Sequence, residues 1–182
     1  MTLRRRRTLP LAMLGALALS GAALVGCTPE AEPTPTPTAA FASEEEAFAA
    51  AEEVYRALTA AVNDVDPSKT ETFEAVYELS SGTFEEADRE NYSTMHAEGH
   101  KISGDATVLS FTGTSSTAPF THVEALVCLD VSDVTVTDAS GNSLVNPNRP
   151  DIYALTVGFE HDGERLLVDS AERTEDQACV AS

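Results

Sequence analysis

The hydrophobic pattern of this chain changes its period once, at Gly99, and that change restricts the fold more than any other feature. Before Gly99, apolar residues recur at steps of three and four, which is the spacing of one helix face. After Gly99, apolar and polar residues alternate, which is typical of half-buried strands. The order predicts an α+β fold, with N-terminal helices packed on a bent antiparallel sheet of about four strands.

The first predicted helix is the most strongly patterned. Ser43 and Glu46 have the spacing of a capping box, and Asp66-Pro67 ends the pattern. Its apolar face comprises Phe48, Ala51, Tyr55, Leu58, Val62 and Val65.

Two shorter helices are predicted to follow. The second one has an apolar face at Phe73, Val76 and Tyr77 and is expected to stop at Gly82. Thr83 is then expected to cap a third helix, which lies at the surface and ends at Gly99.

The strands are predicted over residues 102–112, 121–137, 153–159 and 165–173. Within the second of these, the apolar residues change face between Val131 and Val134, which predicts a β-bulge that bends the sheet. Asp162-Gly163 predicts a hairpin turn between the last two strands.

The N-terminus has the organisation of a secretory signal. Arg4–Arg7 precede an apolar run over residues 9–25, and no acidic residue occurs before Glu30. The run is slightly short for a permanent membrane span, although an N-terminal anchor helix is the alternative interpretation. Residues 6–9 partly resemble a twin-arginine export signal; the general secretory route is favoured, and the other stays open.

Leu24-Val25-Gly26-Cys27 resembles the lipobox of bacterial lipoproteins. The resemblance implies that residues 1–26 are a signal peptide cleaved after Gly26, and that a diacylglyceryl group is attached to the Cys27 sulfur. Two or more acyl chains matter, because a single chain gives only reversible membrane binding. The expected location is the outer face of the cytoplasmic membrane.

Residues 27–40 are predicted to form a tether between the lipid and a folded domain at 41–182. Four prolines alternate mainly with threonines in this segment, which favours extended polyproline II and a reach of roughly 40 Å. The chain carries 30 acidic against 11 basic residues, and four of the basic residues lie in the predicted leader. Binding to phosphates needs a basic surface, so nucleic acid is excluded as a partner.

The whole pattern is similar to that of small actinobacterial lipoproteins with an NTF2-like domain, a class that includes SnoaL-like and ketosteroid-isomerase-like folds. The resemblance rests on the helix-then-strand order, the lipobox, the Thr-Pro tether, segments 128–132 and 138–142, and Cys179. It implies a cone in which a cavity lies between the long helix and the concave sheet. Tyr55, Tyr77 and Tyr153 are the residues expected to line such a cavity.

Cys128 and Cys179 are the two cysteines that remain once Cys27 is assigned to lipid. Outside the cytoplasm, two cysteines most simply form one disulfide, and two buried free thiols are the alternative.

Catalytic and metal-binding patterns are weak. His96 and His100 are four residues apart, but Gly99 interrupts the helix between them, so neither a metal nor another cofactor is predicted. The first helix offers no carboxylate on its apolar face, and no hydrolase, kinase or dinucleotide-binding motif occurs.

These observations predict a membrane-anchored extracytoplasmic lipoprotein that is not an enzyme. Its domain is expected to bind a small apolar ligand or an envelope protein. Two alternatives stay open: a cavity enzyme of the isomerase or cyclase type, and a structural protein of the cell envelope.

Overall fold

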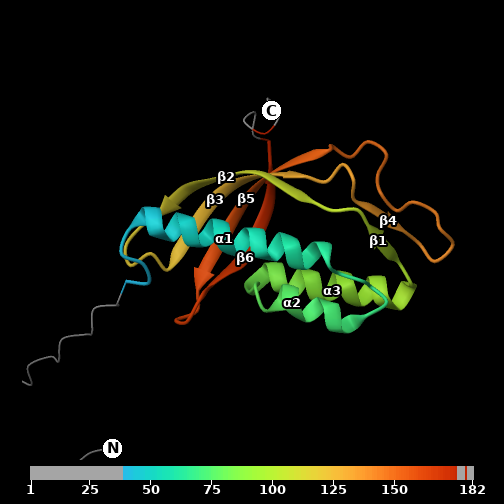
Figure 1. Ribbon diagram of the computed structural model, residues 1–182, viewed down its shortest axis with the longest axis horizontal. Helices are drawn as coiled ribbons and strands as arrows, with labels where there is room; N and C mark the ends of the chain where they lie inside the picture. Colours follow the sequence, from blue (N-terminus) through green and yellow to red (C-terminus); the bar gives the residue numbers. More distant parts are fainter. Residues whose placement is uncertain (1–38, 176–178, 180–182) are drawn as a thin grey trace, which may run out of the picture. The chain divides into compact units, whose positions relative to one another are not determined.

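The computed structural model describes residues 39–175 and Cys179. Four helical segments come first: α1 (Glu44–Asn63), η1 (Thr70–Phe73), α2 (Glu74–Tyr77) and α3 (Gly82–Glu98). Six strands follow: β1 (Lys101–Ser103), β2 (Thr107–Ser116), β3 (His122–Asp130), β4 (Thr135–Thr137), β5 (Ile152–His161) and β6 (Leu166–Thr174). The α-helices lie on one face of a four-stranded antiparallel sheet (Figure 1), so the predicted α+β arrangement is confirmed.

The long helix α1 begins where the sequence predicts. The Ser43 hydroxyl accepts a hydrogen bond from the Glu46 backbone N–H at 3.2 Å, and the Glu46 carboxylate accepts one from the Ala42 N–H at 2.9 Å. The helix ends at Asn63, slightly before Asp66-Pro67. The Asn63 side chain exchanges two hydrogen bonds of 2.9 Å with the Ala106 backbone, which fixes the helix end to the approach of β2.

The prediction for the second and third helices is partly wrong. The second helix is only a 3-10 turn and the short α2, and Gly82 is the first residue of α3 rather than a stop. Ser81, not Thr83, is the N-cap residue, and its hydroxyl donates to the Asp169 carboxylate at 3.1 Å. The start of α3 is therefore set by the contact between Ser81 and Asp169 of β6. The spacing of residues within the helix does not indicate that contact.

The main sheet has the strand order β2-β3-β5-β6, and every neighbouring pair is antiparallel. Register shifts occur in the β2–β3 pair, at Val108/Ser110 and Gly113/Ser115, and in the β5–β6 pair at Gly158/Phe159. Such irregularities increase local twist and bend a strand. The sheet is therefore bent, but the irregular positions differ from the predicted one.

The expected bulge near Val131 is wrong because the chain leaves the sheet there. The Val134 N–H donates to the Val131 carbonyl in a turn, and β4 then pairs with β1 in a separate two-stranded ribbon. The predicted strand over 102–112 is likewise split at Gly104, which has a φ of +79°. Two of the predicted strands are thus divided, and the pieces nearest Gly104 and Val134 pair with each other.

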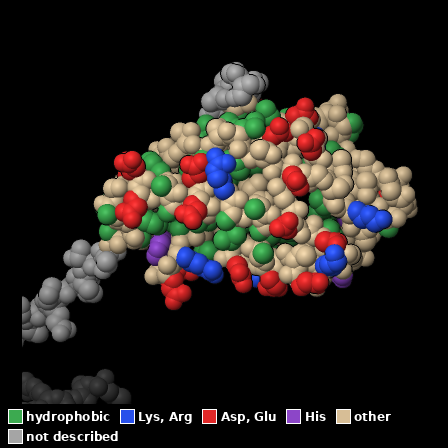
Figure 2. Space-filling view, viewed as in Figure 1, with side chains coloured by type: hydrophobic (Ala, Val, Ile, Leu, Met, Phe, Trp, Pro, Cys, Tyr) green, Lys and Arg blue, Asp and Glu red, His purple; other side chains and the backbone are tan. Residues whose placement is uncertain are grey.

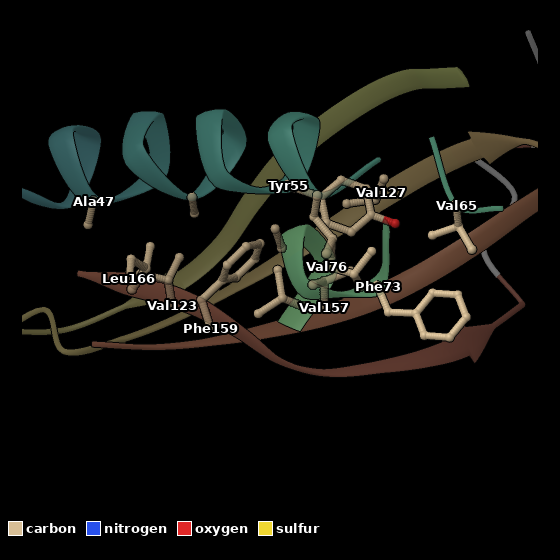
Figure 3. Packing of buried hydrophobic residues seen from close by; sticks show 14 of the residues in the cluster. Ala47, Tyr55, Val65, Phe73, Val76, Val123, Val127, Val157, Phe159 and Leu166 are labelled. Atoms are coloured by element: carbon tan, nitrogen blue, oxygen red, sulfur yellow. The ribbon is translucent and has the colours of Figure 1, made fainter. Parts of the chain in front are cut away.

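The core lies between α1, α2 and the helix-facing side of the sheet (Figure 3). The rings of Tyr55 in α1 and Phe159 in β5 meet edge to face, with their centroids 6.5 Å apart. Gly113 of β2 accommodates the Phe48 ring, because a Cβ at that glycine would lie 2.3 Å from the nearest ring atoms. Side chains therefore fill the space under the long helix. The fully buried ones include Ala47, Ala51, Val123, Val157 and Phe159.

A disulfide joins Cys128 of β3 to Cys179, with their Cα atoms 5.3 Å apart. It fixes Cys179 to a central strand of the sheet. The predicted leader at 1–26, with Leu24, Val25 and Gly26, lies outside the described residues, as do Cys27 and the predicted tether up to residue 38. Within residues 39–175, no helix has the length and the apolar character needed to cross a bilayer.

Candidate functional site

Two adjoining pockets lie at the C-terminal end of α3, and both include His100 in their lining. The first pocket has a volume of about 590 Å³ and lies between the segment after α1 and the start of β1. The second pocket has a volume of about 490 Å³ and lies against the ends of β5 and β6. Its lining residues are Met95, His100, Val136, Leu144, Val145, Asn146, Asn148, Arg149, Pro150, Tyr153 and Arg173. We call it the α3–β6 pocket.

The sheet register places the α3–β6 pocket on the helix-facing side of the sheet. Directly paired residues of antiparallel strands share a face, and Val127 of the core pairs with Leu155, which in turn pairs with Arg173. Tyr153 lies two residues from Leu155 on the same strand, so it shares that face. The pocket is therefore on the same face of the sheet as the core, beyond the point where the packed core ends.

The two arginines of the α3–β6 pocket are held in different ways. Nη2 of Arg149 donates to the carbonyls of Val131 and Val134 at 2.7 and 2.9 Å, which fixes the loop before β5 against the turn after β3. The guanidinium of Arg173 lies over the Tyr153 ring, 3.7 Å from its centroid. This cation–π contact keeps a positive charge at the pocket wall although Arg173 is exposed.

The charge of this pocket contrasts with that of the chain. Acidic side chains are spread over the molecular face in Figure 2, and the chain has 30 acidic residues in all. Among the described residues that line the α3–β6 pocket there is no carboxylate, while two arginines and one histidine are present. Its apolar wall includes Leu144, which is 48% exposed.

His100 is positioned by the end of α3. Gly99 adopts the left-handed conformation with a φ of +69° and stops the helix, as predicted, and the His100 backbone N–H donates to the Met95 carbonyl at 2.9 Å. Nε2 of His100 lies 2.9 Å from the Glu98 carboxylate, and the His100 side chain is only 13% exposed.

His96, in the last turn of α3, is held separately. Nδ1 of His96 lies 2.8 Å from the Pro67 carbonyl, in the first pocket. Within the described part of the chain, no group of three or more metal-ligating side chains converges.

The three tyrosines proposed as pocket-lining residues lie in three different places. Tyr55 is in the core, where burial raises the pKa of its hydroxyl to about 12. Tyr77 packs with Phe73, and the Arg89 guanidinium lies 3.9 Å from its ring centroid. Tyr153 lines the α3–β6 pocket, so the structure does not bring the three together.

Asp88 is an isolated acid that the sequence did not single out. One of its carboxylate oxygens is buried and has no hydrogen-bond partner in the described structure. Burial raises the pKa of this carboxyl to about 6. Its charge also contributes to raising the pKa of Tyr92, after the larger effect of burial. Asp88 lines neither of the two pockets at the end of α3.

Comparisons with known proteins bear on the fold alone. No protein-family profile and no curated protein sequence matches the chain significantly. The intermembrane space region of the chloroplast protein ARC6 is similar in structure, with a TM-score of 0.54 and 13% identity, over 71% of this chain and 97% of that one. This likeness agrees with the α+β architecture.

Two further structures are more distant. A candidate aromatic ring hydroxylase from Novosphingobium aromaticivorans has a TM-score of 0.49 and 11% identity, covering 72% of this chain and 96% of its own. The protein Aln2 from a Streptomyces species has a TM-score of 0.44 and 14% identity, covering 76% and 96% respectively. At these scores neither likeness bears on the activity of this chain.

Proposed function

We propose that this protein is a lipid-anchored extracytoplasmic lipoprotein whose α+β domain binds a small ligand without transforming it. The α3–β6 pocket is the observation that carries the binding role. Its volume of about 490 Å³ lies within the range of small-molecule sites, roughly 300–1,000 Å³. It combines apolar side chains with a few fixed polar groups, which is the usual composition of such sites.

The anchoring role is supported by the sequence. Cys27 directly follows Leu24-Val25-Gly26 at the end of an apolar run, and a proline-rich segment separates it from the first described residues. An acidic domain is repelled by an anionic bilayer, so a lipid and a spacer suit it better than direct surface contact. The Cys128–Cys179 disulfide suits an oxidising compartment outside the cytoplasm.

The anchor is tested by labelling growing cells of the source organism with an alkyne-bearing fatty acid. We expect label in the natural protein, with an intact mass that begins at a lipidated Cys27. The Cys27→Ala variant is expected to take up no label and to keep residues 1–26. The Thr34→Ala variant, which changes the predicted tether and keeps every cysteine, serves as the control and is expected to be labelled normally. Label in the Cys27→Ala protein, or an unlabelled natural protein, would refute the anchor.

The binding role is tested by native mass spectrometry of the protein purified from the source organism. We expect a non-covalent small molecule to be retained at one copy per chain and to be released on denaturation. A protein that carries only its covalent lipid, in repeated preparations and at low collision energy, would contradict the proposal.

A second candidate is acid–base chemistry at the same pocket. The observation that favours it is the pairing of His100 with the Glu98 carboxylate at 2.9 Å, since a carboxylate can orient a histidine as a base. Incubation with a small-molecule extract of the host separates the two roles. A binding protein removes at most one equivalent of a molecule, whereas an enzyme converts many equivalents and loses that turnover in His100→Gln.

A further inference from the structure

The α3–β6 pocket differs from the rest of the molecule in the sign of its charge. Seven basic residues follow Cys27, against 30 acidic residues in the chain, and two of the seven line this one pocket. No carboxylate occurs among its described lining residues. Eleven lining residues at the average composition of this chain would include about two acids.

The positive groups are also fixed before any ligand arrives. Arg149 uses Nη2 for its two bonds to backbone carbonyls, and its guanidinium has further N–H donors. Arg173 is placed by the Tyr153 ring beneath it. Donors that are already oriented lose less conformational entropy on binding than free side chains.

Another part of the pocket lining is apolar. Met95, Val136 and Leu144 come from α3, β4 and the following loop. Arginine and aliphatic surfaces at one pocket match a molecule with an anionic group at one end and an apolar body at the other. A concave pocket of about 490 Å³ suits a whole small molecule better than the flat surface of a membrane.

We propose that the α3–β6 pocket selects amphiphilic anions, namely free carboxylates or sulfonates on an aromatic or aliphatic body, and that Arg173 is the specificity-determining residue. The inference deepens the proposed binding function and rests on it. Arg149 is given a structural role in the pocket wall and is not used to test charge selection. Its removal would also leave the Val131 and Val134 carbonyls without a hydrogen-bond partner, which would disturb the wall itself.

Two fluorescent probes with the same ring system test the charge selection. One is 1-anilinonaphthalene-8-sulfonate, and the other is N-phenyl-1-naphthylamine, which lacks the sulfonate. They are titrated into the mature chain, residues 27–182 with Cys27→Ser, prepared without acyl groups. The chain has no tryptophan, so protein emission does not overlap with that of the probes. We expect the sulfonate to bind at least about tenfold more tightly, the ratio produced by about 1.4 kcal/mol.

Three variants assign this preference to Arg173. Arg173→Gln is expected to weaken sulfonate binding about five- to tenfold and to change binding of the neutral probe less than about twofold. Arg173→Lys keeps the charge and is expected to retain most of the preference. Arg165→Gln, in the β5–β6 turn, removes the same charge elsewhere and is the matched control, expected to change neither affinity.

The outcomes separate this inference from the proposed function. Binding of neither probe would overturn both. Equal binding of the two probes, or an equal loss of both in Arg173→Gln, would leave a ligand pocket but overturn selection by charge. Displacement of the sulfonate probe by decanoate, and not by decyltrimethylammonium, is the expected confirmation with an aliphatic ligand, and equal displacement by both would contradict it.

Discussion

Breaking the Cys128–Cys179 disulfide is expected to remove a large share of the domain's stability. The two cysteines are separated by 51 residues in the sequence. In the chain-entropy model, a loop of that length constrains the unfolded state by about 4 kcal/mol at 25 °C. Natural domains have a free energy of unfolding of about 5–15 kcal/mol, so this single bond can account for about a quarter or more of it.

Urea unfolding followed by circular dichroism measures this contribution. The mature chain with Cys27→Ser contains only the two paired cysteines, so it is compared with and without reductant, and with the Cys128→Ala/Cys179→Ala double variant. At a typical m-value, a loss of about 4 kcal/mol lowers the urea midpoint by about 2 M.

Reduction is expected to add 2 Da to the intact mass, because two hydrogens are gained. The reduced protein and the double variant should unfold at similar midpoints. The reasoning is refuted if the mass does not change, or if reduction gives the mass change and leaves the urea midpoint where it was.

Three further changes probe the stability of the domain outside the α3–β6 pocket. In urea melts, Asp88→Asn is expected to raise the free energy of unfolding by about 1 kcal/mol at pH 8 and to have no effect at pH 4. The reason is that the folded-state pKa of Asp88 is about 6, so its ionised carboxylate destabilises the domain above that pH. Gly113→Ala should lower stability by about 1–3 kcal/mol, because the new methyl group meets the Phe48 ring; an unchanged melting temperature would contradict this. Ser43→Ala should cost about 1 kcal/mol of stability by removing the N-cap bond of α1, whereas Ser43→Asp should retain it.

The sequence was most informative where a local pattern and the tertiary structure agree. The face of α1 carries buried Ala51, Tyr55 and Leu58, so its helical period was visible. Gly99 ends α3 by its own left-handed conformation, which is also a local property. These elements could be predicted because a single residue or a single face determines them.

Other boundaries depend on contacts between distant segments. The start of α3 is set by Ser81 against Asp169, which are 88 residues apart. The division of two predicted strands results from the pairing of Ile102 with Val136 in the small ribbon. No periodicity within either segment contains that information.

The candidate site was found only in part. Tyr153 was named as a pocket residue from the sequence, whereas Met95 of α3, Arg149 of the loop before β5 and Arg173 of β6 were not. The sequence nevertheless held one signal. In a chain with 30 acidic residues, the seven basic residues after Cys27 are candidates for a site that binds an anion. Tyr55 was misplaced because the same helical period describes a residue in a filled core and one in an open cavity.

The position of the ligand is tested most directly by NMR of the isotopically labelled mature chain, with Cys27→Ser, on addition of decanoate. The account predicts dose-dependent amide shift changes around Met95, in the loop over residues 144–150, and at Tyr153 and Arg173. The amides of the β5–β6 turn, residues 162–165, lie at the other end of β5 from Tyr153 and should stay unchanged, which provides an internal control. Shift changes that are absent, or confined to surfaces away from the α3–β6 pocket, would contradict the account.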